Sequence, residues 1–328
     1  MLQTGKNMIV DLSVIIPVYN AMPLLERTLD SIFSQKTRYS FEVILVDDGG
    51  TDNSVDYIKS RPESNIILVQ QQNAGPARAR NNGVSHANGK YCAYLDADDF
   101  WEESFIEKTV SFLKDHNECI AVSVGQRHLT VSGEGISPKC INEYTQPIVL
   151  DDFFDFWGRY MHVCTGSVCV KTEILKLAGG QREDLRIAED LEFWALLSTY
   201  GKWGFIPEVL FTSDGTELIK DNATWKRKMQ PRWNNAPSVE DWQKRIVARI
   251  GCNVPEGFKK ARGRIASMFV YSHVMSERSK LARNDVKVYG NYFPAGKAYT
   301  IIKLASKIPV SWWVFCRFLH IKENRRFK

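Results

Sequence analysis

The sequence predicts an α/β protein, with a mixed, mostly parallel sheet flanked by helices and a helical C-terminal extension. Three observations lead to this prediction. From residue 12 onward, short apolar runs alternate with amphipathic stretches, which is the pattern of β-strands joined by helical crossovers. No internal repeat is present. Beyond residue 214 the strand-like runs give way to helix-like periodicity, so we predict one domain over residues 1–214 and a mainly helical extension over residues 215–328.

The alternation is clearest in the first hundred residues. The expected strands are LSVIIPV (12–18), FEVILVD (41–47), IILVQ (66–70) and YCAYLD (91–96), and the expected helices are PLLERTLDSIFSQ (23–35), DNSVDYIKSR (52–61) and PARARNNGVSHA (76–87). In the first helix Leu25, Leu29 and Ile32 recur at helical spacing and mark one apolar face. Asp52 is the expected N-cap of the second helix.

The second part of the domain is expected to be less regular. The pattern predicts a strand pair with a glycine-rich turn (120–136), a buried strand (165–170), a short helix (172–178), a helix (187–201) and a final strand (203–214).

Composition and charge narrow the functional class. Seven cysteines form no CxxC pair, so reduced thiols are expected rather than disulfides or structural zinc. The N-terminal segment lacks the pattern of a secretory signal, and no run of 18 apolar residues occurs, so we expect a cytoplasmic protein. The net charge of +5 comes from the last 28 residues, where seven basic residues face one acidic residue, Glu323. The rest offers no basic face for nucleic acid, and no GxGxxG follows the first strand, which argues against a dinucleotide oxidoreductase.

Acidic residues follow two of the expected strands. Asp47 and Asp48 end the second strand, and Asp96 and Asp98 follow the fourth. Open parallel sheets bind ligands at the carboxyl ends of their strands, so these acids should meet at one edge. In an extended segment Asp96 and Asp98 would face one point, as two hard oxygen ligands for Mg²⁺ or Mn²⁺, while Asp99 would cap a helix. Taken alone, the motif is more typical of a turn after a strand, where Asp is common.

Five motifs occur in order along the chain. They are SVIIPVYNA (13–21), VDDGGTDNS (46–54), NAGPARARNNG (73–83), YLDADD (94–99) and AED (188–190). In this combination the chain resembles the inverting family 2 glycosyltransferases, which have the GT-A fold and use nucleotide sugars. The resemblance covers about residues 10–214. It implies a metal-dependent hexosyltransferase that moves a sugar, usually from a UDP-sugar, to a glycan or lipid-linked acceptor in cell-surface polysaccharide synthesis.

The resemblance also implies roles for individual residues in donor binding. Pro17, Tyr19 and Asn20 match the wall of the nucleotide pocket, and Asp48 matches the residue that hydrogen-bonds the base, usually uracil. Arg80 and Asn81 match the segment that lines the pocket near base and sugar. The DXD motif is Asp96-Ala97-Asp98, in which Asp96 would contact ribose or metal and Asp98 would hold Mn²⁺ or Mg²⁺.

Asp190 matches the catalytic base of the family. With a reference pKa near 3.9 it would be ionised at neutral pH and able to take the proton of an acceptor hydroxyl. Glu189 is left open between orienting a neighbour and contacting substrate, and Asp184 is a rival for the base. Without the resemblance, Glu189 and Asp190 fit a first helical turn stabilised by the helix dipole.

The sequence departs from the family pattern in two places. Gly50 stands where Ser is usual, which we expect to alter only turn geometry. The QPRW segment (230–233) is one residue shorter than the QxxRW box of processive members, so we interpret it as coincidental and expect a non-processive enzyme. A catalytically silent nucleotide-sugar or glycan-binding protein on the same fold is the alternative.

The aromatic and basic end of the chain, residues 298–328, leaves two interpretations open. One is a contact with an anionic membrane surface, which would place the protein peripherally on the cytoplasmic face of the inner membrane. The other is a helical cap with a solvated basic end. Pro309 and the scattered charges argue against a membrane-spanning helix.

Overall fold

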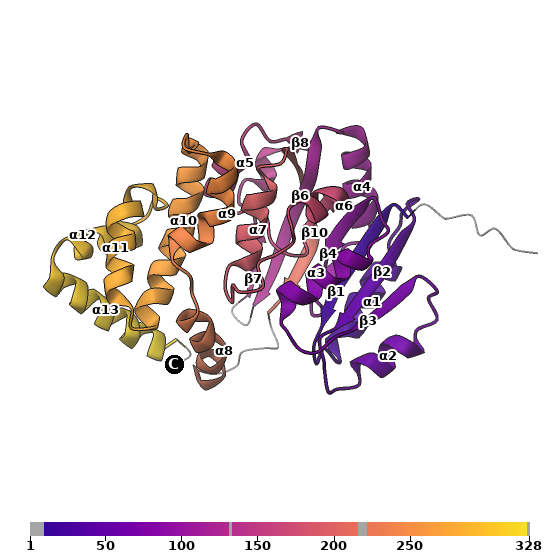
Figure 1. The fold of residues 1–328 in the computed structure, drawn as a ribbon, viewed down its shortest axis with the longest axis horizontal. Coiled ribbons are helices and arrows are strands. Elements are labelled where there is room, and N and C mark those ends of the chain that lie inside the picture. The colour runs from indigo at the N-terminus through magenta and orange to yellow at the C-terminus, as the bar shows by residue number, and fades with distance from the viewer. Residues whose placement is uncertain (1–9, 131–132, 216–221, 327–328) are drawn as a thin grey trace, which may run out of the picture.

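The computed structural model describes residues 10–130, 133–215 and 222–326. The expectations for the N-terminal nine residues and for Lys328 therefore lie outside the described residues. Figure 1 shows a central sheet with helices on both faces and a group of C-terminal helices at one end. This arrangement confirms the predicted α/β class and the helical C-terminal region.

The strands form one mixed sheet. They are β1 (Leu12–Val18), β2 (Phe41–Asp47), β3 (Ile66–Gln70), β4 (Tyr91–Tyr94), β5 (Phe100–Trp101), β6 (Cys119–Thr130), β7 (Gly133–Ser137), β8 (Ile148–Val149), β9 (Val168–Lys171) and β10 (Lys202–Asp214). The order is β3-β2-β1-β4-β9-β6-β10-β5, with β7 beside β6 and β8 beside β10. The β3-β2-β1-β4 part is parallel, whereas β9 runs antiparallel to both β4 and β6.

Helices cover both faces of this sheet and continue beyond it. They are α1 (Leu24–Phe33), α2 (Ser54–Ser60), α3 (Pro76–His86), α4 (Phe105–Asp115), α5 (Phe153–Tyr160), α6 (Thr172–Leu177), α7 (Glu189–Leu197), α8 (Asn222–Asn234), α9 (Val239–Ile250), α10 (Glu256–Met275), α11 (Ser279–Tyr289), α12 (Lys297–Lys307) and α13 (Pro309–Asn324), with 3₁₀ turns at Ile141–Glu143 and Gly290–Tyr292. The prediction that Asp52 caps α2 is wrong, because Asn53 occupies the N-cap position. The Asp52 carboxylate instead accepts bonds from the N–H groups of Met22 (3.0 Å) and Ser54 (3.1 Å), which ties together the loops after β1 and β2.

Alternation along β1 divides the core between the two faces. Val14 and Ile16 pack in one cluster with α1 and α4, and Ile15 packs in the other, which also contains residues of α3. This follows from the period of two along a strand that is buried on both faces. The sheet is thereby held between two apolar layers, which keeps its strand ends in fixed positions.

The cluster that contains Ile15 extends without interruption into the C-terminal helices. It contains residues of α5 and α7 together with residues of α9, α10, α11 and α13. In Figure 1, α9 and α10 lie between α7 and the outermost helices, α12 and α13. The division at residue 214 stays a prediction, but residues on both sides of it share this core.

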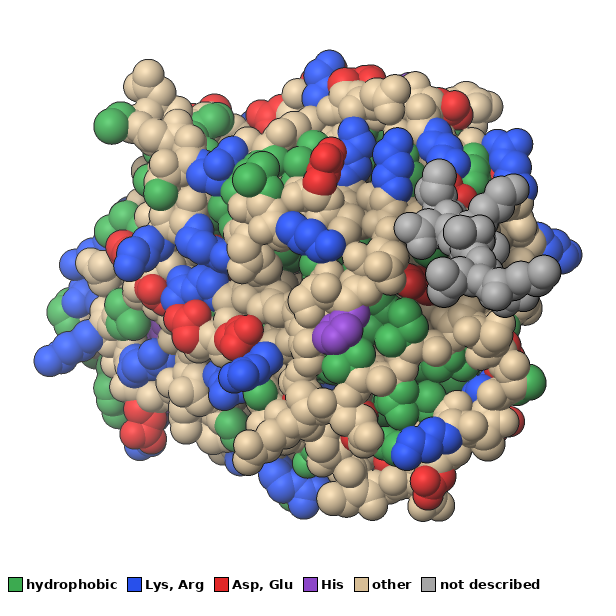
Figure 2. Space-filling view, turned by 45° about the vertical axis from the view of Figure 1, so that its right-hand side comes forward, with side chains coloured by type: hydrophobic (Ala, Val, Ile, Leu, Met, Phe, Trp, Pro, Cys, Tyr) green, Lys and Arg blue, Asp and Glu red, His purple; other side chains and the backbone are tan. Residues whose placement is uncertain are grey.

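Two surface properties complete the description. Within the described ranges, no helix combines the length and the apolar content needed to cross a membrane. On the face seen in Figure 2, basic and acidic side chains are dispersed among one another over most of the surface.

Candidate active site

A cleft of about 1010 Å³ opens where β1, β2 and β4 end. This is the edge at which parallel strands present their carboxyl ends, and the volume is ample for a nucleotide-sized ligand. Ten of the eleven predicted site residues line it, namely Pro17, Tyr19, Asn20, Asp48, Arg80, Asp96, Ala97, Asp98, Glu189 and Asp190. Motifs that begin at residue 13 and end at residue 190 therefore contribute to one cavity.

Two side chains organise the loops on one wall of the cleft. Asn20 has a left-handed backbone (φ 49°), and its Oδ1 accepts bonds from the N–H groups of Thr51 (2.7 Å) and Asp52 (3.2 Å). The buried Asp48 carboxylate accepts bonds at 2.8 Å from the N–H groups of Ala74, to Oδ1, and Gly75, to Oδ2. A carboxylate oxygen can accept two bonds, so Oδ2 of Asp48 keeps capacity for a ligand donor.

The DXD segment is a turn and not the extended segment that was expected. The N–H of Asp99 donates to the carbonyl of Asp96 at 3.1 Å, which closes the turn. Asp96 and Asp98 nevertheless both line the cleft. The prediction that Asp99 caps a helix is also wrong, because β5 follows it and its Oδ1 accepts the N–H of Asp214 at 3.0 Å. Burial, together with the charges of Asp96 and Asp98, raises the pKa of Asp99 to about 8.

Arg80 is the buried cation of the acidic group. Its Nη2 donates to Oδ1 of Asp96 at 2.6 Å, and its side chain is only 6% exposed. Burial raises the pKa of Asp98 above its usual value, and the negative charge of Asp96 raises it further. Asp98 forms no ion pair with any described cation, and the charges of Lys228 and Arg27 oppose the rise in its pKa only in part.

The carboxylate oxygens of Asp96 and Asp98 suit a hard divalent cation. Asp96 and Asp98 supply carboxylate oxygens, and an added positive charge would relieve the repulsion between them. In the described part of the chain, no group of three or more His, Cys, Asp or Glu side chains could hold a metal ion. A cation here would therefore complete its coordination with water and ligand oxygens, as Mg²⁺ commonly does with phosphate ligands.

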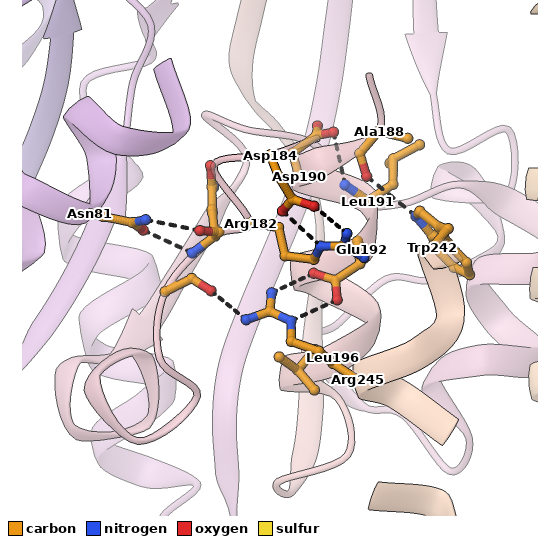
Figure 3. A network of polar contacts seen from close by, with 12 residues as sticks. Asn81, Arg182, Asp184, Ala188, Asp190, Leu191, Glu192, Leu196, Trp242 and Arg245 are labelled. Atoms are coloured by element: carbon orange, nitrogen blue, oxygen red, sulfur yellow. Dashed lines mark hydrogen bonds and ion pairs between the residues drawn. The ribbon is translucent and has the colours of Figure 1, made fainter. Parts of the chain in front are cut away.

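Asp190 lies in the first turn of α7 and faces the same cleft. Its Oδ1 accepts the N–H of Leu191 at 2.8 Å (Figure 3). Burial raises the pKa of Asp190 to about 6; the charge of Glu189 adds to the rise, while Arg80 opposes it. Asp190 is thus still mostly ionised at pH 7, but it is a stronger base than an Asp with the reference pKa near 3.9.

Two residues considered from the sequence lie outside this cleft. Asn81 exchanges bonds with the backbone of Gln181 (2.8 and 2.9 Å), and so ties α3 to the loop before α7. Asp184 is exposed and paired with Arg182, and a hydrogen bond from that guanidinium lowers its pKa. Neither position supports direct contact with a ligand in the cleft.

Three cations at the cleft were missed by the sequence reasoning. Arg186 precedes α7, and Lys228 and Arg232 lie one turn apart on α8, so both project from the same side of that helix. None of the three forms an ion pair with a described carboxylate. The QPRW segment was the available signal, because it contains Arg232.

Solved structures with a similar fold bind nucleotide sugars. Residues 1–349 of TarS from S. aureus, solved with UDP-GlcNAc, match with a TM-score of 0.62 and 18% identity, over 96% of this chain and 90% of that one. The mannosyltransferase PcManGT from Pyrobaculum calidifontis, solved with GDP-Man and Mn²⁺, matches with a TM-score of 0.56 and 20% identity, over 98% of this chain and 88% of that one. At these identities the likeness establishes the GT-A fold.

Sequence relatives are closer. An uncharacterized glycosyltransferase of Rickettsia bellii is 30% identical over 220 residues, which is 64% of this chain and 30% of that protein. GgaB of Bacillus subtilis, named for minor teichoic acid biosynthesis, is 28% identical over 66% of this chain and 25% of its own length. The chain spans less than a third of the first curated relatives that it matches.

A shorter relative and a family description decide the classification. TuaG of Bacillus subtilis, named for teichuronic acid biosynthesis, is 35% identical over 192 residues, covering 58% of this chain and 72% of that protein. The family model Glycosyl transferase family 2 matches residues 13–171, the span that holds the first four of the five motifs, from SVIIPVYNA to YLDADD. The chain therefore belongs to the family 2 glycosyltransferases.

Proposed function

We propose that this protein is a non-processive, inverting glycosyltransferase that moves one sugar from a nucleoside diphosphate sugar to an acceptor hydroxyl. The observation that carries the proposal is the meeting of Asp48, Asp98 and Asp190 in one cleft at the strand ends. Uracil is the proposed base, since Oδ2 of Asp48 can accept a further N–H and a fold neighbour was solved with UDP-GlcNAc.

The proposed step is a single displacement. Asp190 takes the proton of the acceptor hydroxyl as the acceptor oxygen bonds to the anomeric carbon, while the bond from that carbon to the diphosphate oxygen breaks. Attack on the face opposite the leaving group inverts the anomeric centre. The raised pKa of Asp190 favours this proton transfer.

Negative charge accumulates on the departing diphosphate, and the cleft can compensate it in two ways. Arg186, Lys228 and Arg232 line the opening and attract a polyanion. Asp96 and Asp98 would hold Mn²⁺ or Mg²⁺, which supplies Lewis-acid stabilisation of the leaving group when bound. We propose that activity depends on a metal ion because these two carboxylates suit one. A fold neighbour was solved with Mn²⁺.

The acceptor is proposed to be a glycan or a lipid-linked saccharide of a cell-surface polysaccharide. Relatives named for teichoic and teichuronic acid biosynthesis support this class. The roles assigned to Pro17, Tyr19, Asn20, Ala97 and Glu189 are part of the proposal and rest on their positions in the cleft.

Incubation of the protein with UDP-glucose, UDP-N-acetylglucosamine and GDP-mannose, with Mn²⁺ or with chelator, tests the function. We expect one donor to be bound and slowly hydrolysed or transferred. Asp190→Asn should lower turnover by about 10²- to 10⁴-fold, because the base is lost, and leave donor affinity unchanged. Binding without turnover in the wild type would favour the silent binding protein, and no binding of any donor would overturn the proposal.

We also propose that α12 and α13 contact an anionic membrane surface, with the protein at the cytoplasmic face of the inner membrane. Their outer side carries large apolar residues that are each more than half exposed, namely Ile301, Leu304, Ile308, Val310, Trp313, Val314, Phe318 and Ile321. From residue 297 to residue 326, seven basic residues accompany a single acidic one, Glu323. The combination of apolar stripe and basic charge matches an anionic lipid interface.

Co-sedimentation with vesicles of phosphatidylglycerol or of phosphatidylcholine tests this contact. Wild type should bind the anionic vesicles and lose binding as salt rises. Trp313→Ser combined with Phe318→Ser should reduce binding, whereas Leu177→Ser, at another exposed apolar residue, should not. Equal binding by all three proteins would leave the helices as a solvated cap.

A further inference from the structure

Helix α9 of the C-terminal region holds the segment that carries Asp190. Three residues on α9, Asp241, Trp242 and Arg245, each bond to the chain between residues 180 and 192. Figure 3 shows the bonds of Trp242 and Arg245. The sheet side contributes the bonds of Asn81 to Gln181. The segment of residues 180–192, which carries Asp190, is thus held from two sides. One of these sides, α9, lies in sequence well beyond the region that matches the family.

One of these contacts is an ion pair between the buried Glu192 and the partly exposed Arg245. Nε of Arg245 donates to Oε1 of Glu192 at 2.8 Å, Nη2 donates to Oε2 at 2.5 Å, and Nη1 donates to the carbonyl of Gly180 at 3.0 Å. Glu192 is fully buried. A bidentate pair constrains direction as well as distance, so the rotation of α7 about its axis is restricted.

That rotation matters because of the spacing between Glu192 and Asp190. Two residues along a helix correspond to about 200° around its axis, so the two carboxylates point in nearly opposite directions. Glu192 points to α9, and Asp190 points into the cleft. Fixing Glu192 therefore fixes the direction of Asp190.

The start of the helix is held by Trp242. Its indole Nε1 donates to the carbonyl of Ala188 at 3.3 Å, and Ala188 has a left-handed backbone (φ 59°) just before α7. Non-glycine residues adopt this conformation at an energetic cost, so the surrounding structure must maintain it. Arg182, in the preceding loop, donates to the Asp241 carbonyl at 2.7 Å and closes the connection.

We propose that Arg245 and Trp242 are positioning residues for Asp190, acting through Glu192 and Ala188, so that α9 sets the geometry of proton transfer. This inference rests on the proposed role of Asp190 as the base. Neither residue lines the cleft, so their loss should change turnover and leave donor affinity intact.

The test compares variants that keep the fold. Arg245→Met alone leaves Glu192 buried without a partner, so it is combined with Glu192→Leu; replacing a buried pair by apolar groups is often neutral for stability. We expect kcat of the double variant to fall by about 10- to 100-fold, because a displaced base reacts slowly, with unchanged donor Kd by calorimetry. Trp242→Phe, which keeps an aromatic side chain but removes the indole N–H donor, should lower kcat to a smaller extent.

Arg249→Met is the matched control. Arg249 lies one turn further along α9 and bonds to Oγ1 of Thr199, beyond the end of α7, so its loss should leave kcat unchanged. Arg245→Lys should restore part of the turnover of Arg245→Met, since it keeps the charge and loses the fork.

Wild-type turnover in a folded double variant would overturn the inference, as would a parallel loss of donor affinity. If the double variant does not fold, Trp242→Phe provides the test, and an unchanged kcat of Trp242→Phe would overturn the inference. Absence of transfer by the wild type would instead refute the proposed function.

Discussion

At the scale of single residues, the cleft is an acidic group built around one buried cation. Arg80 pairs with Asp96 and partly compensates Asp190, while Asp98 has no paired cation among the described side chains. Burial and like charge raise the pKa of both Asp98 and Asp190. The raised pKa makes Asp190 a stronger base. At Asp98, a bound cation would stabilise the ionised carboxylate.

The pKa of Asp190 predicts the acid limb of activity. Because burial raises this pKa to about 6, Asp190 is deprotonated and active above pH 6 and becomes protonated below it. We expect kcat/KM to fall about tenfold per pH unit below pH 6. Asp184→Asn, a change outside the cleft, should leave the profile as in the wild type, and a limb near pH 4 would contradict the effect of burial.

Removal of divalent ions should act on donor binding. With chelator, the repulsion between Asp96, Asp98 and a diphosphate is uncompensated, so donor affinity should fall and recover on addition of Mn²⁺. Asp98→Asn should abolish this response. Asp30→Asn, at an exposed position on α1 that pairs with Arg61, should retain it. An affinity that is equal with and without chelator would exclude a metal at the DXD turn.

At the scale of elements, close packing and helix propensity oppose each other in α3. Gly83 faces β1, and a Cβ there would lie 2.4 Å from Cγ2 of Ile15. The glycine therefore allows α3 to approach the sheet closely. This approach brings Arg80, one turn earlier on the same helix, next to Asp96.

Gly83→Ala should destabilise the protein even though alanine is the better helix former. Propensity would gain about 1 kcal/mol, whereas overpacking costs about 1–3 kcal/mol and backbone shifts would be needed to relieve the overlap. Urea unfolding should show a lower midpoint. Ser85→Ala, on the exposed side of α3, should show an equal or higher midpoint, and a rise in both variants would contradict the close contact.

Elements could be predicted from the sequence because periodicity depends on neighbours within a few residues. The strand ends and the acids that follow them were located in this way. The partners of individual side chains could not be predicted in this way. Asp99 bonds to Asp214, and Glu192 pairs with Arg245, which is 53 residues away. An apolar face or a charge is visible in the sequence, whereas the surface that it meets is set by tertiary packing. For the same reason the cations of α8 were not connected with the cleft.

At the scale of the whole molecule, a buried histidine couples stability to pH. His162 is fully buried, and neither ring nitrogen has a hydrogen-bond partner among the described residues. Rings of Phe153, Phe156 and Phe205 surround it at 4.8–6.1 Å between centroids. These aromatic residues come from α5 and β10, so protonation of His162 would charge the junction of helix and sheet.

The free energy of unfolding should therefore begin to fall at a pH above the range in which most carboxyl groups titrate. Burial lowers the pKa of His162 from 6.5 to about 3, so its contribution to stability is complete above pH 6.5 and is lost as the pH falls toward 3. Between pH 7 and pH 5 this loss is about 2 kcal/mol. His162→Leu should remove that part of the decline in urea unfolding at the two pH values. An equal decline in the variant would show that another group is responsible.

The attachment of α7 to α9 has a practical consequence for any attempt to graft part of this chain onto another protein. The matched family region ends at residue 171, and the last strand of the sheet ends at Asp214. A chain cut at either point, or grafted there onto another protein, would lack Arg245. A graft ending at Asp214 would also remove the whole of α9, and so would uncover Glu192 together with the apolar residues of α7 that pack against α9. The smallest transplantable unit is therefore defined by an ion pair, and it extends at least to the end of α9.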